Sequence, residues 1–155
     1  MDARRPPALA RLDILVGRWT VQPKVDGLGA AWSEFSWVED GAFLRQITDV
    51  DAIPDSAPPE WQANAPFPTV AHIGLDDTAE AYTMLYADSR AVYRVYQMTF
   101  TGREWTMLRL AEGFNQRFVA TLSDDRNAID GRWEMSPDGE NWHVDFGLAY
   151  TRVTG

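Results

Sequence analysis

Arginine recurs in this 155-residue chain on short segments that otherwise carry aromatic and aliphatic side chains. The arginines concerned are Arg94, Arg109, Arg117 and Arg132. A guanidinium that points into an apolar interior without an acidic partner should bind an anion strongly, because an uncompensated buried charge is costly. The ordinary alternative is that each arginine faces solvent or pairs with a carboxylate on a neighbouring strand. The orientation of each side chain therefore decides whether it can take part in binding.

Arg94 and Arg109 are the strongest of these candidates, because each shares a predicted strand face with an aromatic residue. The segment 92–98 reads VYRVYQM, and side chains alternate along a strand, so Arg94 lies on the same face as Tyr96. By the same rule Arg109 shares a face with Trp105. We predict that Arg94 or Arg109 points inward and holds the acidic or carbonyl head of a ligand. If the opposite face of 92–98 points inward, Arg94 is simply solvated.

The other candidate residues are aromatic side chains and one histidine on neighbouring segments. The predicted ligand site comprises Trp37, His72, Tyr86, Arg94, Tyr96, Trp105, Arg109 and Trp133. A lone histidine between apolar residues is more often structural than functional, and His72 has that alternative. The chain contains no Ser-His-Asp, His-x-x-x-His or phosphate-loop pattern, so an enzyme would depend on ordinary acids and bases. The candidates for that role are His72, Tyr86, Asp88 and Tyr96.

The charge and composition of the chain restrict the partners and the cellular location that we expect for the protein. The formal net charge of −9 argues against nucleic acid, which requires clustered basic residues. No segment approaches the ~20 apolar residues of a transmembrane helix, so we expect no membrane insertion. Arg4 and Arg5 precede a segment broken by Arg11 and Asp13, which does not fit an export signal. Cysteine is absent, which excludes a cysteine-based zinc site and suits a cytoplasmic protein. We expect no metal and no cofactor, and the sequence leaves monomer and homodimer open.

The candidate residues lie on a series of short strand-like segments after a brief helical stretch. Leu9, Leu12 and Leu15 recur at three-residue intervals, which predicts one or two helical turns. Polar turns such as SPDG at 136–139 then separate strand-like runs. The runs are 17–25, 30–39, 42–52, 69–76, 81–88, 92–100, 104–111, 115–123, 128–135 and 141–153.

Short polar turns join antiparallel neighbours, and closing about ten strands into a barrel removes the two exposed edges of an open sheet. We therefore predict an all-β protein: a single antiparallel up-and-down β-barrel formed by one domain, residues 1–155. A two-sheet sandwich is the alternative. The long connection at 53–68 carries five prolines and Trp61, and it is either a rigid connector or a lid over one mouth of the barrel.

Two short motifs near the ends of the chain add to this prediction. GRW at 17–19 opens the first predicted strand, and YTR at 150–152 ends the last one. Together they resemble the G-x-W signature and terminal arginine of the calycin superfamily, which includes lipocalins and fatty-acid-binding proteins. In those barrels the tryptophan packs across the closed end against the arginine, an arrangement that gains cation–π attraction. The resemblance implies structural roles for Gly17, Trp19 and Arg152.

A longer resemblance extends from IGLDD at 73–77 to the end of the last strand. The motifs that carry it are YADSRAVYRVY at 86–96, FNQRF at 114–118, GRWEMSPDGENW at 131–142 and DFGLAYTR at 145–152. They are similar to those of a family of small bacterial calycin-like proteins of unknown function. Ala91 stands where that family usually has glycine, which puts the conformation of its turn in question. The resemblance implies a fold and no particular chemistry.

The leading hypothesis from these observations is a barrel that binds a small, largely apolar molecule, with an arginine at its head group. The alternative is a cyclase or isomerase of a hydrophobic metabolite, and a third hypothesis is a filled barrel without a ligand. Haem-binding barrels of the nitrobindin type use a single late histidine, for which His143 is the candidate. Their G-x-W-x-G-x-G opening differs from GRWTVQPKV at 17–25, which argues against haem.

Overall fold

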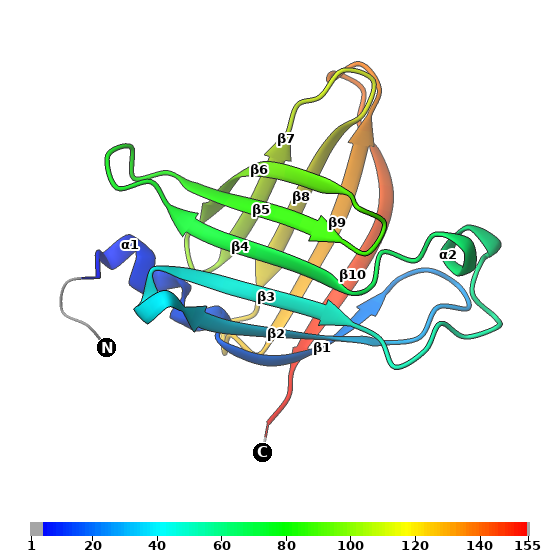
Figure 1. Cartoon of the computed structure of the whole chain (residues 1–155), viewed down its shortest axis with the longest axis horizontal. Helices are drawn as coiled ribbons and strands as arrows, with labels where there is room; N and C mark the ends of the chain where they lie inside the picture. The colour runs from blue at the N-terminus through cyan, green and yellow to red at the C-terminus, as the bar shows by residue number, and fades with distance from the viewer. Residues whose placement is uncertain (1–4, 155) are drawn as a thin grey trace.

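The chain folds into a closed barrel of ten antiparallel strands with a short helical segment near its N-terminus (Figure 1). This computed structural model describes residues 5–154. Residues 1–4, which include Arg4, and residue 155 belong to the predicted domain but lie outside the described residues. The strands are β1 (Gly17–Pro23), β2 (Ala31–Val38), β3 (Phe43–Asp49), β4 (Thr69–Leu75), β5 (Tyr82–Asp88), β6 (Tyr93–Phe100), β7 (Glu104–Arg109), β8 (Asn115–Leu122), β9 (Ala128–Ser136) and β10 (His143–Arg152). All ten predicted strands are present.

Strand order confirms the up-and-down barrel and excludes the sandwich. Each strand pairs with its neighbours in the chain, and β1 also pairs with β10, which closes the sheet. Burial alternates along most strands; in β6, for example, Tyr96, Met98 and Phe100 are buried, whereas Tyr93 and Val95 are exposed. This alternation follows from the pleat of a strand with one face on the barrel interior.

The N-terminal segment covers one end of the barrel. It consists of a single α-helical turn, α1 (Pro7–Ala10), and a 3₁₀ turn, η1 (Arg11–Leu15), as the leucine spacing predicts. Leu9, Leu12 and Leu15 are all buried in the core. No helix among residues 5–154 is both long and apolar enough to cross a membrane.

Arg152 ties this closed end together. Its guanidinium carbon lies 4.2 Å from the centre of the Trp19 ring, and the two residues face each other across β1 and β10. The Nη atoms of Arg152 donate to the carbonyl oxygens of Ile14 and Val16, at 2.5 and 2.9 Å. Gly17 has a φ of 125°, and a Cβ there would lie 3.3 Å from an Nη atom of Arg152. The contact implied by the calycin resemblance is therefore present, and glycine leaves room for it.

The turn between β5 and β6 is formed despite the missing glycine. Ala91 adopts a φ of 65°, in the left-handed region that glycine tolerates best. Its N–H donates to the carbonyl of Asp88 at 3.0 Å, and the N–H of Asp88 donates to the carbonyl of Val92 at 3.1 Å. Ala91 thus forms a tight turn in a conformation that glycine adopts more easily.

Regular alternation of the two faces breaks down in β10. Regular alternation along 141–153 would place Trp142 and Val144 on the same face as Phe146, Leu148 and Tyr150. The pairing of β10 with β9 instead shifts between Val144 and Phe146, which marks a β-bulge. Val144 is 61% exposed, whereas Leu148 and Tyr150 are buried. The bulge inserts an extra residue and reverses the faces of the strand before it.

The connection between β3 and β4 lies at the end of the barrel opposite α1 (Figure 1). It contains a short helix, α2 (Pro59–Ala63), which the sequence did not predict. The ring of Trp61 packs edge-to-face against Phe146 of β10, with 5.7 Å between the ring centres. Ser89 holds the end of the connection through hydrogen bonds to the carbonyls of Phe67 and Pro68, at 2.6 and 3.2 Å. The connection therefore covers the mouth of the barrel.

Candidate functional site

Arg94 and Arg109 both lie on the interior face of their strands. Arg94 alternates with the exposed residues Tyr93 and Val95 of β6, and Tyr96, which follows it on the inward face, is 2% exposed. Arg109 follows Trp105 on β7 in the same way, and Trp105 is 1% exposed. The inward orientation that the aromatic neighbours predict is the one that the structure shows.

Arg117 and Arg132 have the ordinary role of outward strand residues. Both approach Glu134, with nitrogen–oxygen distances of 2.9 and 3.7 Å. The hydrogen bond from Arg117 lowers the pKa of Glu134, which keeps this carboxylate ionised. Arg117 also stacks on Trp142, with 4.3 Å between the guanidinium carbon and the ring centre.

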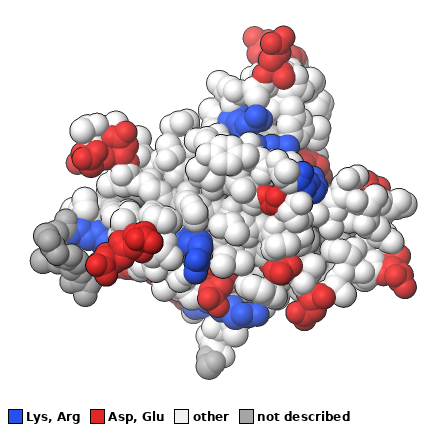
Figure 2. Space-filling model, in the orientation of Figure 1, with Lys and Arg blue, Asp and Glu red and all other residues white. Residues whose placement is uncertain are grey.

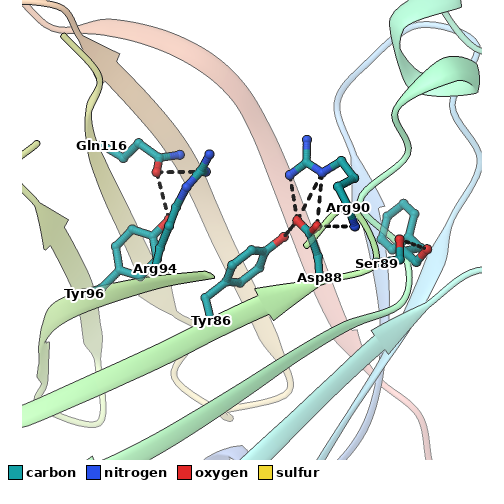
Figure 3. Close-up of polar contacts among 8 residues, drawn as sticks. Tyr86, Asp88, Ser89, Arg90, Arg94, Tyr96 and Gln116 are labelled. Atoms are coloured by element: carbon teal, nitrogen blue, oxygen red, sulfur yellow. Dashed lines mark hydrogen bonds and ion pairs between the residues drawn. The ribbon is translucent and has the colours of Figure 1, made fainter. Parts of the chain in front are cut away.

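The side chain of Arg94 extends from β6 to a residue on β8. Its Nη1 donates to Oε1 of Gln116 at 3.1 Å, and the hydroxyl of Tyr96 donates to the same oxygen at 2.9 Å (Figure 3). The guanidinium also lies over the ring of Phe114, 5.2 Å from its centre. Burial raises the pKa of Tyr96, so its hydroxyl stays protonated and neutral at physiological pH. The partners of Arg94 are thus neutral groups.

Arg109 is a second positively charged residue, and it lies near Gln116. It stands opposite Gln116 in the pairing of β7 with β8, and its Nη1 makes a long hydrogen bond of 3.5 Å to the carbonyl of Phe114. Within residues 5–154, neither Arg94 nor Arg109 takes part in an ion pair. Two inward-facing positive charges are therefore held by uncharged partners, which leaves their charge available to an anion.

A second polar cluster lies beside the first on β5 and the following turn (Figure 3). The hydroxyl of Tyr86 donates to Asp88 at 2.7 Å, and Arg90 forms an ion pair with the same carboxylate at 2.7 Å. Burial opposes ionisation of Asp88, but hydrogen bonds from Arg90 and Tyr86 outweigh it and lower its pKa. Burial and the bond to Asp88 raise the pKa of Tyr86. Arg90, unlike Arg94, is therefore neutralised within the protein.

Two adjoining cavities lie beneath these clusters. The deep cavity, of about 130 Å³, is mostly apolar and is lined by Met84, Met107, Phe118, Leu148 and other core residues. The mouth cavity, of about 250 Å³, is more polar and is lined by Arg94, Tyr96, Gln116 and Asp145, among others. Both cavities are lined by Trp61, Pro66, Tyr86, Trp133 and Phe146, so they lie next to each other. A single water needs only ~10–15 Å³, so the interior has room for a larger molecule.

Five of the eight predicted site residues line these cavities, and Arg109 lines a surface groove that it shares with Arg94. The five are Tyr86, Arg94, Tyr96, Trp105 and Trp133. Trp37 shares the inward face of β2 with Phe35, but it lies at the closed end, where its indole N–H donates to Asp13 at 2.7 Å. His72 alternates with the buried Ala71 and Ile73 and so faces outward, where it packs on the ring of Phe43. Trp37 and His72 are therefore remote from the cavities.

The structure adds Gln116, Asp145 and Trp61 to the site. Gln116 lies two residues before the buried Phe118, so alternation along FNQRF could have placed it inward. Asp145 reaches the mouth cavity only because of the bulge in β10, which the sequence pattern does not reveal. Asp145 is exposed as a residue, but partial burial of its carboxyl raises its pKa, which makes it a better base than a fully solvated carboxylate. His143, the haem candidate, is exposed at the start of β10, outside both cavities.

Among residues 5–154 no group of three side chains is arranged to hold a metal ion. No protein-family model matches the chain, and no curated protein sequence matches it. The function therefore has to be argued from the site itself.

Proposed function

We propose that this protein binds a small amphipathic anion inside its barrel. The observation that carries the proposal is Arg94, an inward-facing guanidinium that is hydrogen-bonded to neutral Gln116 and has no ion-pair partner among the described residues. It stands above an apolar cavity that can take the hydrophobic part of the same molecule. An apolar pocket with a few convergent polar groups is the usual form of a small-molecule site.

The arrangement of the two cavities defines how the ligand would lie. The acidic or carbonyl head would bind in the mouth cavity beside Arg94, with Arg109 supplying a second positive charge nearby. The apolar part would extend into the deep cavity between Met107 and Phe118. Trp61 would close over the ligand from the connection between β3 and β4. Binding by this route uses side chains alone and requires no metal or cofactor.

The motifs at 17–19 and 150–152 and the closed ten-strand barrel together support membership of the calycin superfamily, and this assignment is part of the proposal. Members of that superfamily carry hydrophobic ligands inside their barrels. A cytoplasmic location, with a small molecule rather than nucleic acid as partner, completes the proposed role.

Two fluorescent probes that differ in one group test the anchoring role of Arg94. 1-Anilinonaphthalene-8-sulfonate carries a sulfonate, whereas N-phenyl-1-naphthylamine has the same rings without it. We expect Arg94→Met to weaken binding of the sulfonate by about tenfold to a hundredfold, because a hydrogen bond to a charged group contributes ~1.5–3 kcal/mol. Binding of the uncharged amine should change little.

Arg132→Met is the matched control for that experiment. It removes the same charge from a side chain that faces outward. Equal affinity of Arg94→Met and wild type for the sulfonate would contradict the anchor, and equal losses in both variants would indicate only an effect of net charge. If neither probe binds the wild type, the barrel does not take up amphipathic aromatic molecules and the proposal fails.

The second candidate is an enzyme that moves a proton on a bound hydrophobic molecule. Asp145 favours it, because this carboxylate lines the mouth cavity and burial raises its pKa. If Asp145 is a general base, a molecule that co-purifies with the protein should take up deuterium at an acidic C–H position in D₂O. Asp145→Asn should abolish that exchange while leaving binding intact, and exchange by neither protein would leave binding as the function.

A further inference from the structure

The barrel is closed, but the pairing between β6 and β7 ends at Gln97 and Leu108. The two strands pair over only four residues of each, from Phe100↔Trp105 to Gln97↔Leu108, although β6 extends back to Tyr93. By contrast, β5 pairs with β6 from Tyr82↔Met98 to Ala87↔Tyr93. Figure 1 shows the same feature, since β6 and β7 lie together at one end and diverge toward the mouth.

A surface groove of about 530 Å³ follows this split. Its rim carries large apolar side chains that are unusually accessible: Tyr93 is 65% exposed, Leu110 is 69% exposed, and Val95 and Leu108 are also exposed. Scattered exposed apolar residues are common, but a cluster along an opening marks a surface that contacts an apolar molecule.

Arginines stand where the groove meets the interior. Arg94 lines both the groove and the mouth cavity, so one side chain is accessible from the two spaces. Arg109 lines the groove from the opposite strand. Figure 2 shows several basic groups close together over the area where β6 and β7 diverge in Figure 1. The split therefore combines an apolar rim with positive charge, which is complementary to an amphipathic anion.

The mouth itself is the more obstructed route. The connection between β3 and β4 lies across it, with Trp61 packed on Phe146 and the end of the segment held by Ser89. Ser56 holds its other side, because its hydroxyl donates to the carbonyl of Gly27, in the turn between β1 and β2, at 2.8 Å. Opening this route would require these contacts to break. Between β6 and β7, the side chain of Arg94 spans the opening to reach Gln116.

We propose that the split between β6 and β7 is a lateral entrance through which an amphipathic anion reaches the barrel interior, with Arg94 as its gate. The inference rests on the proposed binding function. The anionic head meets Arg94 and Arg109 in the groove while the apolar part lies along Tyr93 and Leu110. Arg94 then releases Gln116, turns inward with the anion, and re-forms its contact with β8 behind the ligand.

The absence of cysteine allows this entrance to be closed chemically. Gln97 faces Leu108 at the end of the ladder, so Val95 and Leu110 would be the next outward-facing pair if the strands continued together. In the double variant Val95→Cys and Leu110→Cys, a short bismaleimide linker would join the two strands across the split. Thr99→Cys with Thr106→Cys is the matched control, because these residues already face each other in the paired part of the same strands.

The measurement is the rate of 1-anilinonaphthalene-8-sulfonate binding and release by stopped-flow fluorescence, with cross-linking verified by mass spectrometry. Closing a route slows association and dissociation by the same factor and leaves the dissociation constant unchanged. We expect both rates to fall by about one to two orders of magnitude in the Val95/Leu110 cross-linked protein, within the range over which association rates of related complexes vary. The Thr99/Thr106 cross-link should change neither rate.

Unchanged rates in the Val95/Leu110 cross-linked protein would overturn the lateral entrance while leaving binding in the barrel intact. A loss of affinity instead of rate would show that the probe sits in the groove, which also overturns the proposal. Ala111→Trp, which fills the groove without a linker, serves as a second variant and should slow both rates as well. If wild-type protein fails to bind the probe at all, the proposed binding function itself fails.

Discussion

Replacing Arg152 with methionine should destabilise the barrel more than the loss of any other arginine considered above. The substitution removes the charged donor from the carbonyls of Ile14, Val16 and Arg126, and each such hydrogen bond contributes ~1.5–3 kcal/mol when buried. It also removes the cation–π contact with Trp19, which contributes ~0.5–2 kcal/mol. Because these contacts are only partly buried, water replaces some of the lost bonds. We therefore expect a loss of about 3–4 kcal/mol, near the upper limit for single substitutions.

Urea denaturation followed by tryptophan fluorescence measures this loss as a shift of the midpoint at constant slope. In a thermal melt the same loss corresponds to a decrease of roughly 6–16 °C for a protein of this size. Arg152→Lys keeps the charge but lacks the planar fork that reaches several carbonyls, so it should fall between wild type and methionine. Arg132→Met, on the outer face, should change stability by less than about 0.5 kcal/mol. A similarly small effect of Arg152→Met would refute the view that this side chain ties the N-terminal segment to the barrel.

Two further predictions concern stability. Ala91→Gly should stabilise the protein by up to about 1 kcal/mol in urea denaturation, because a left-handed alanine costs ~1–2 kcal/mol and the greater freedom of glycine when unfolded offsets part of that gain; a destabilised variant would contradict the strain. The pKa of Glu134 is lowered from its usual 4.5 by Arg117, so its contribution to stability is fully present above that value and is lost as the pH falls through the lower, folded-state pKa. The stability difference between wild type and Glu134→Gln should accordingly stay constant from about pH 7 to about pH 5 and shrink below pH 4.5, and a difference that stays constant on further acidification would show that the ion pair is not linked to folding.

Period-two alternation predicted the barrel strands because each has one face on a continuous interior. The Asp- and Gly-rich turns marked their ends within a few residues. Alternation also grouped Arg94 with Tyr96 and Arg109 with Trp105, and the interior position of the aromatic partner settled the orientation of both arginines. The same rule failed in β10, where one extra residue between Val144 and Phe146 reversed the faces.

Position along a strand was harder to predict than face. Trp37 has the inward orientation of a site residue, yet it lies at the closed end beneath the N-terminal segment, bound to Asp13. The sequence pattern does not indicate whether an inward-facing residue lies near the open or the closed end of the barrel. That depends on where the chain termini and the long connections pack in the folded protein. Trp61 shows the converse, since a residue in a Pro-rich connection reaches the mouth only through the tertiary path of that segment.

The sequence by itself determined the number of strands, their antiparallel order and the two sets of side chains on each strand, since these depend on local alternation and turn chemistry. Only the tertiary structure decided that β6 and β7 diverge after four pairs and that Arg94 spans the opening to reach Gln116. The physical reason is that curvature and closure of the sheet depend on all ten strands together. Whether an inward arginine meets a carboxylate, an amide or an open cavity is decided at that level, by residues far away in the chain.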